Sequence, residues 1–99
     1  MFAPVKFLYL TQQQVHDLRP SYKEIVRLVE ASLRDKARGR SEMPPKIAIH
    51  VRPGKFIHAK PGYLGFMDVA GIKWQSNIVD NPKRNLPNNI GTMVLNEPI

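Results

Sequence analysis

The sequence predicts one α+β domain over residues 1–99, in which one short and one long helix accompany a mostly antiparallel or mixed sheet. Three observations favour this fold class. Apolar residues recur at helical spacing between Ile25 and Leu33, and apolar and polar residues alternate one by one from Lys46 to Val51. Proline and glycine separate several short apolar runs in the second half. Helices followed by runs of strands are typical of α+β domains, and 99 residues suffice for one modest core.

The chain is expected to begin with a strand and a short helix. Residues 6–10 form an apolar run that predicts the strand. Thr11 and Gln14 then form a capping-box pattern, in which each side chain satisfies a free backbone amide of the other residue. This pattern predicts a short helix that ends at about Leu18.

A long helix follows. Ser21 and Glu24 form a second capping-box pattern at its start. The apolar residues of 25–33 make one stripe, and the charged residues between them face solvent. The helix is expected to end near Ala37 or Arg38, where Gly39 supplies the left-handed stop. We expect this helix to lie on one face of the sheet.

The rest of the chain predicts strands. Residues 43–45 cannot be helical, because the two prolines lack amide donors and restrict the residue before them. Tight turns are expected at 52–55 and at Pro61-Gly62, a loop at 80–84, and an exit from the last strand at 96–99. The strands themselves are predicted at residues 46–51, 56–60, 63–67, 69–76 and 90–95.

The composition narrows the function classes. The net charge is +7, and residues 46–84 hold seven Lys/Arg against two Asp/Glu. These cations occur singly, without a basic run or an RNA-binding signature, so nucleic acid is only a distant alternative. Cysteine is absent, which excludes disulfides and thiolate catalysis, and no His/carboxylate spacing predicts a metal site. No P-loop, GxGxxG, GxSxG or HExxH motif is present.

Neither a signal peptide nor an apolar run of membrane-spanning length is present in the sequence. Together with the lack of cysteine, this pattern fits a reducing compartment. We therefore expect a cytoplasmic protein without membrane contact.

Single lysines on strands point to a small anionic ligand. Lys46 shares one strand face with Ala48 and His50 because side chains alternate along a strand. Lys73 lies between two apolar residues, where an unpaired ammonium would be costly to bury. A small anion would pair with these lysines, and plain solvated surface is the alternative. His50 and His58 are expected to approach each other across a hairpin.

Four motifs resemble those of the N-terminal region of the ornithine cyclodeaminase/mu-crystallin family, in order and in spacing. They are MPPK at 43–46, HAKPGYL at 58–64, GIKW at 71–74 and NPKRNLP at 81–87. The sequence MVLNEP at 93–98 is similar to the strand before that family's crossover. The resemblance covers essentially the whole chain.

The resemblance implies the substrate-binding and dimer-forming part of an NAD(P)-dependent enzyme. Members of the family act on amino acids or cyclic imines, by ornithine cyclodeamination, alanine dehydrogenation or ketimine reduction. It implies that Lys46 and Lys73 are catalytic, hold the substrate carboxylate and polarise the reacting group. It also implies that His58 and Asn88 lie near the substrate, and we expect Arg84 to contact the substrate at the rim of the pocket. The ligand is thus expected to be a small carboxylate or amino acid.

Two positions depart from the family pattern. His58 stands where the family often has arginine, and Asn88 stands where it often has serine or threonine. Histidine lacks the two-pronged hydrogen bonding of arginine and is only partly charged at neutral pH, so ligand and affinity are expected to differ. The sequence reaches residue 99 without the glycine-rich turn of a Rossmann domain, so we expect no cofactor bound by this chain and no turnover by it alone.

The sequence therefore predicts a truncated substrate-binding and dimerisation domain that is inactive alone. A stand-alone, non-catalytic module that binds a small anion or dimerises is the alternative, and a basic nucleic-acid-binding domain is the distant third.

A homodimer is also expected, because one helix covers only one face of a sheet. We expect one apolar layer to be needed by Ile47, Ile49 and Val51. A second layer is expected for Phe56, Ile72, Trp74 and Met93. The resemblance implies two-fold pairing in which two sheets merge into one closed β structure without exposed edges.

Overall fold

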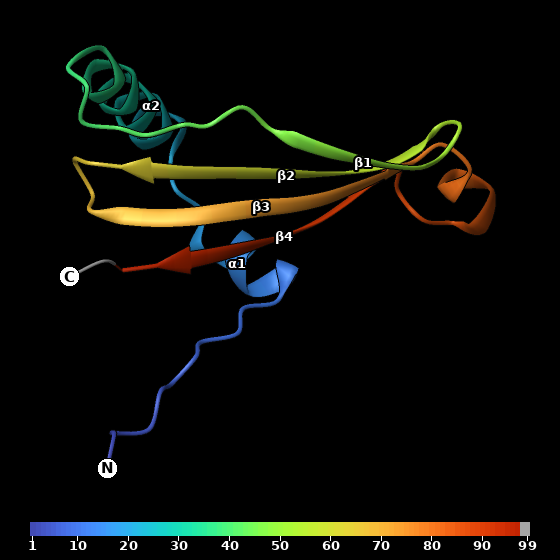
Figure 1. The fold of residues 1–99 in the computed structure, drawn as a ribbon, viewed down its shortest axis with the longest axis horizontal. Helices are drawn as coiled ribbons and strands as arrows, with labels where there is room; N and C mark the ends of the chain where they lie inside the picture. The colour runs from blue at the N-terminus through green and yellow to red at the C-terminus, as the bar shows by residue number, and fades with distance from the viewer. Residues whose placement is uncertain (98–99) are drawn as a thin grey trace.

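Two helices precede a four-stranded antiparallel sheet, which confirms the α+β prediction (Figure 1). The computed structural model describes residues 1–97. The exit predicted after the last strand falls partly on Pro98 and Ile99, which lie outside the described residues. No helix in the described chain is long and apolar enough to cross a membrane. The strands lie side by side in chain order as β1 (Ile47–Arg52), β2 (Lys55–Leu64), β3 (Val69–Ile78) and β4 (Asn89–Asn96).

Both helices begin at the predicted caps. Before α1 (Gln12–Leu18), the Thr11 hydroxyl accepts from the Gln14 amide at 3.2 Å, and the Gln14 side chain accepts from the Thr11 amide at 2.8 Å. Before α2 (Tyr22–Ala37), the Ser21 hydroxyl accepts from the Glu24 amide at 3.1 Å, which is only one of the two bonds of the predicted capping box. Gly39 follows α2 with a φ of +72°, the left-handed conformation predicted for the stop.

The strand predicted at residues 6–10 is wrong. This segment is extended but belongs to no strand, and it leads away from the sheet (Figure 1). Its apolar side chains, including Phe7 and Leu8, are exposed. An apolar run supplies strand propensity, yet a strand also needs a partner edge, and no segment of residues 1–97 pairs with this one.

The turn predicted at Pro61-Gly62 is also wrong, because β2 runs unbroken through both residues. Tyr63 exchanges two backbone hydrogen bonds with Glu42, so its amide faces the outer side of β2. The side to which the backbone amides point alternates along a strand, so the nitrogen of Pro61 faces the same side as that of Tyr63. On this side the sheet is continued by the isolated bridge between Glu42 and Tyr63. At such an edge proline costs no ladder hydrogen bond. The chain reverses instead after Leu64, at residues 65–68.

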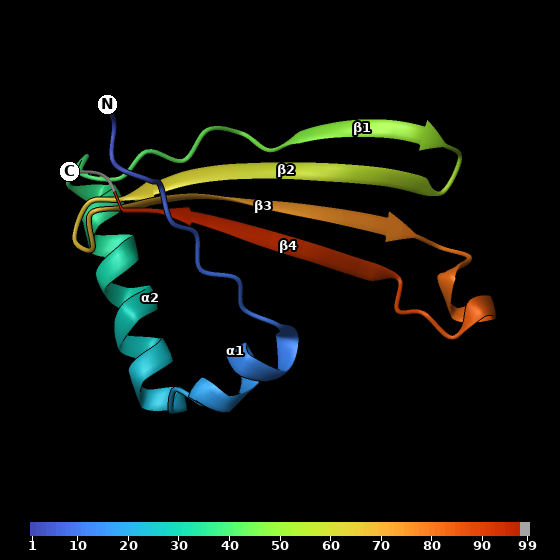
Figure 2. The same cartoon turned by 90° about the horizontal axis from the view of Figure 1, so that it is seen from below.

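Helix α2 does not lie on the sheet as predicted. It stands at the end where β2 turns into β3, and it runs across the strand direction (Figure 2). No apolar side chain of the described residues is buried, so the predicted core is not formed by this chain alone. The radius of gyration is 16.5 Å, against about 13 Å for a compact chain of this length. The surface area is 8964 Å², against about 5,700 Å² expected for 11.3 kDa.

The strand register gives the sheet one apolar face. Ile47 lies opposite Ala59 and Ala59 opposite Trp74, so the three side chains share a face. Phe56 and Met93 lie on the other face, so the predicted second layer of Phe56, Ile72, Trp74 and Met93 is wrong. Alternation along the sequence shows which residues of one strand share a face. Only the register between strands shows which residues of neighbouring strands lie on that same face. We call the following set the apolar face: Ile47, Ile49, Ile57, Ile72, Trp74, Ile90 and Val94.

Candidate functional site

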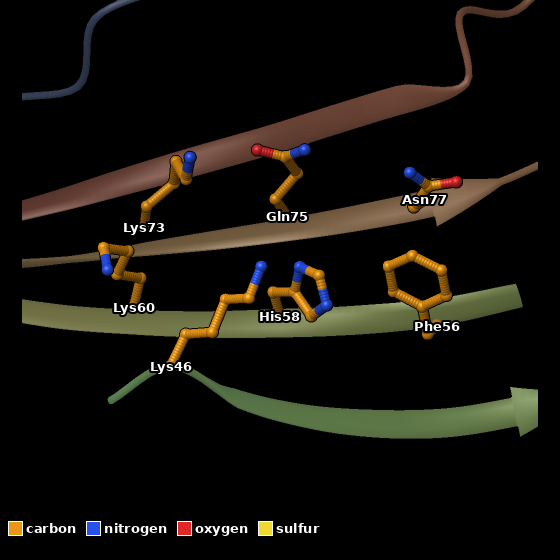
Figure 3. Close-up of a pocket in the computed structure, with 7 residues that line it drawn as sticks. All are labelled: Lys46, Phe56, His58, Lys60, Lys73, Gln75 and Asn77. Atoms are coloured by element: carbon orange, nitrogen blue, oxygen red, sulfur yellow. The ribbon is translucent and has the colours of Figure 1, made fainter. Parts of the chain in front are cut away.

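The opposite side of the sheet carries a cationic hollow of about 470 Å³. Its side chains come from β2, β3 and the residue just before β1, and all rise from the same side of the sheet (Figure 3). Most of them are charged or polar. We call this surface the cationic face; its lining residues are Lys46, Phe56, His58, Lys60, Lys73, Gln75 and Asn77.

The register between β2 and β3 determines which side chains of the hollow lie opposite each other. Lys60 lies directly opposite Lys73, and His58 lies directly opposite Gln75. Lys46, the residue just before β1, extends into the hollow with its amine beside the imidazole of His58 (Figure 3). Alternation along each strand therefore brings together residues that are far apart in the sequence.

The cationic face contains no acidic residue. Among the residues that the structure describes, the salt bridges of the sheet region are those of Asp80 with Lys55 at 3.2 Å and with Lys83 at 3.5 Å. The lysines of the hollow thus have no carboxylate partner within residues 1–97. Like charges directly opposite each other in a sheet destabilise it, so this arrangement favours an anion from outside the chain.

His58 is held among rings and cations. Its ring packs on Phe56 with centroids 4.6 Å apart, and Phe56 also packs on His50 at 6.2 Å. His50 and His58, which were predicted to approach each other, thus both pack on Phe56. The pKa of His58 lies below its ordinary value, first because partial burial disfavours the imidazolium, then because Lys46, His50 and Lys73 repel it. An anion in the hollow would oppose that repulsion.

Arg84 and Asn88 do not line the hollow. Arg84 lies in the short 3₁₀-helix η1 (Asn81–Arg84), and its guanidinium donates to the Asn81 side chain at 2.8 Å. The buried Asn81 in turn donates to the Pro87 carbonyl at 3.0 Å. The Asn88 carbonyl accepts from the Ile78 amide at 2.9 Å. In this structure the loop between β3 and β4 is therefore held together by its own motif residues.

The hollow also includes residues that the sequence analysis did not select. Lys60, Gln75 and Asn77 line it beside the predicted lysines. The signal for them was present, since Lys60 follows His58 by two residues and Gln75 follows Lys73 by two. In residues 1–97 no group of three or more His, Asp or Glu side chains is placed to hold a metal ion.

The fold and the sequence motifs both point to one protein family. The model of the ornithine cyclodeaminase/mu-crystallin family matches residues 6–99, and the chain belongs to this family. The resemblance seen in the motifs is thereby confirmed.

Particular relatives are similar over most of this chain. The nodulation efficiency protein NfeD of Rhizobium meliloti is 38% identical over 98 residues, which are 99% of this chain and 30% of that protein. An alanine dehydrogenase of Archaeoglobus fulgidus is 37% identical over 91 residues, which are 92% of this chain and 27% of that protein. The chain thus spans less than a third of the length of these relatives.

Solved structures show the same fold. An archaeal alanine dehydrogenase, described as a dimer with bound NAD, superposes with a TM-score of 0.81 at 36% identity, covering 90% of this chain and 27% of its own. The Δ1-pyrroline-2-carboxylate reductase of Thermococcus litoralis, in complex with NADH and L-proline, superposes with a TM-score of 0.75 at 29% identity, covering 80% and 25%.

Proposed function

We propose that this chain is the substrate-binding and dimer-forming part of an NAD(P)-dependent enzyme that acts on an amino or imino acid. The observation that carries the proposal is the hollow in which three lysines and a histidine meet without an acid. Family membership supports it, because two relatives are named as an amino-acid dehydrogenase and an imino-acid reductase.

The geometry suggests a role for each cation. Lys46 and His58, whose polar ends lie beside each other, hold the substrate carboxylate (Figure 3). Lys73, on the neighbouring strand, polarises the reacting carbon–nitrogen or carbon–oxygen group as a hydrogen-bond donor. Substrate contacts of Arg84 and Asn88 stay predictions, since both lie in the loop outside the hollow.

The described residues do not fit a nicotinamide cofactor. Dinucleotides bind where parallel strands lead into helices, whereas every strand pair in residues 1–97 is antiparallel. The cofactor, which supplies the hydride chemistry when bound, is therefore assigned to another part of the enzyme. On this proposal, the chain alone binds substrate and turns nothing over. A non-catalytic anion-binding module is the alternative, supported by the same hollow.

Calorimetry on the chain tests the proposed function. Dehydrogenation of an amino acid gives an imino acid, which water hydrolyses to an oxo acid. Titration with such an oxo acid, 2-oxopentanoate, is expected to give saturable binding of one molecule per chain, whereas NADH should give no binding heat. Lack of heat with the oxo acid would overturn the substrate site. Saturable binding of NADH would overturn the assignment of the cofactor to another part of the enzyme.

Substrate affinity is expected to rise as the pH falls from 8 to about 5.5. A bound carboxylate favours the imidazolium of His58, so its pKa is higher in the complex than in the free chain, and a proton is taken up on binding. The gain should be about three- to tenfold, the difference between a neutral and a charged hydrogen bond. Calorimetry across this pH range should show that the affinity of His58→Gln no longer depends on pH. The affinity of His16→Gln, which changes a histidine on α1, should keep this dependence. A flat profile in the unaltered chain would contradict the role of His58.

A further inference from the structure

Lys60 is the cation of the hollow that the proposed catalytic steps do not use. It lies on β2 directly opposite Lys73 and rises from the same face of the sheet. Two ammonium groups placed opposite each other across an antiparallel pair repel. No acid of the described residues offsets this repulsion, although Asp80 does so for Lys55 and Lys83 at the far end of β2.

The cations form two groups rather than one. The amine of Lys46 lies beside the ring of His58, while Lys60 and Lys73 form a second group farther along the same strands (Figure 3). A single carboxylate at the first group leaves Lys60 without a partner. A ligand with a carboxylate at each end would meet both groups, and the hollow of about 470 Å³ is within the usual size of small-ligand sites.

We propose that Lys60 determines specificity and that the substrate is a 2-oxo or imino acid whose side chain carries a second carboxylate. This inference rests on the proposed function of the hollow. In it, Lys46 and His58 hold the first carboxylate, Lys73 faces the reacting group, and Lys60 pairs with the distal carboxylate. The oxo or imino form is preferred to the amino acid, because an ammonium group would be repelled by three lysines.

The test compares two acids of the same carbon chain, 2-oxoglutarate and 2-oxopentanoate, which differ in the distal carboxylate. By calorimetry, 2-oxoglutarate is expected to bind about tenfold more tightly, the lower end for a hydrogen bond between charged groups. Lys60→Gln should bring this ratio to between one and two, because only 2-oxoglutarate loses the charged partner of its distal carboxylate. Lys60→Arg should restore the preference.

Lys36→Gln is the matched control, because it removes the same charge from the exposed surface of α2. It should leave the ratio unchanged. Equal binding of the two acids by the unaltered chain would overturn this inference alone, and so would a ratio that Lys60→Gln leaves in place. Lack of binding by both acids would overturn the proposed function and this inference with it.

Discussion

At micromolar concentration the chain is expected to sediment at about twice its 11.3 kDa mass, and Trp74→Lys to sediment as a monomer. The reason is the apolar face, where Ile47 is 65% and Trp74 46% exposed in the single chain. Residues 1–97 bury no apolar side chain, so the exposed apolar side chains of this face need a partner layer. A second copy supplies it if two sheets meet and bury well over about 1,000 Å² in total.

The expected loss in Trp74→Lys is large. Substitution of a tryptophan at the centre of an interface costs about 2 to 4 kcal/mol of binding free energy. This loss corresponds to a rise in the dimer dissociation constant of about 30- to 1,000-fold. Met67→Lys is the matched control, because Met67 is 48% exposed but lies in the turn between β2 and β3. It should remain dimeric. An unaltered chain that sediments as a monomer at these concentrations would rule out the homodimer.

Lys73→Ala is expected to reduce binding of 2-oxopentanoate by about 30-fold or more. Truncation of one partner of a charged hydrogen-bonded pair costs about 2 to 5 kcal/mol. Lys73 lines the hollow from β3, directly opposite Lys60 on β2. The loss should appear as a weaker dissociation constant in calorimetry, while the circular dichroism spectrum stays the same because the side chain is exposed.

Lys36→Ala removes an equal charge outside the hollow and should bind the acid within about twofold of the unaltered chain, as expected for a screened surface charge. Binding by Lys73→Ala within a factor of two would remove this lysine from the site. The comparison separates a specific contact from the general attraction of an anion to a chain of net charge +7.

The elements that depend on local sequence were predictable. The caps at Thr11 and Ser21 and the glycine stop at Gly39 follow from side chains and backbone freedom within a few residues. The sequence did not predict that residues 6–10 form no strand or that β2 continues through Pro61. Both features depend on which strand edge lies beside the segment.

The residues that line the hollow were likewise predictable only in part. Lys46, His58 and Lys73 were selected from strand alternation and from the family motifs, and the structure places all three around one hollow. Lys60 was missed because the predicted turn at Pro61 ended its strand there. Lys60 nevertheless shares a strand face with His58, and the register, which sets it opposite Lys73, places it in the hollow.

The alternation of β2 and β3 has an evolutionary consequence. His58 and Trp74 lie on neighbouring strands but face opposite sides, so the positions of the cationic face and those of the apolar face are separate and interleaved. Substitutions on the cationic face can therefore change its charge and shape while leaving the apolar face intact. Insertion of one residue within either strand would exchange the two surfaces beyond that point. Such a sheet allows the side chains to diverge but constrains the number of residues between them.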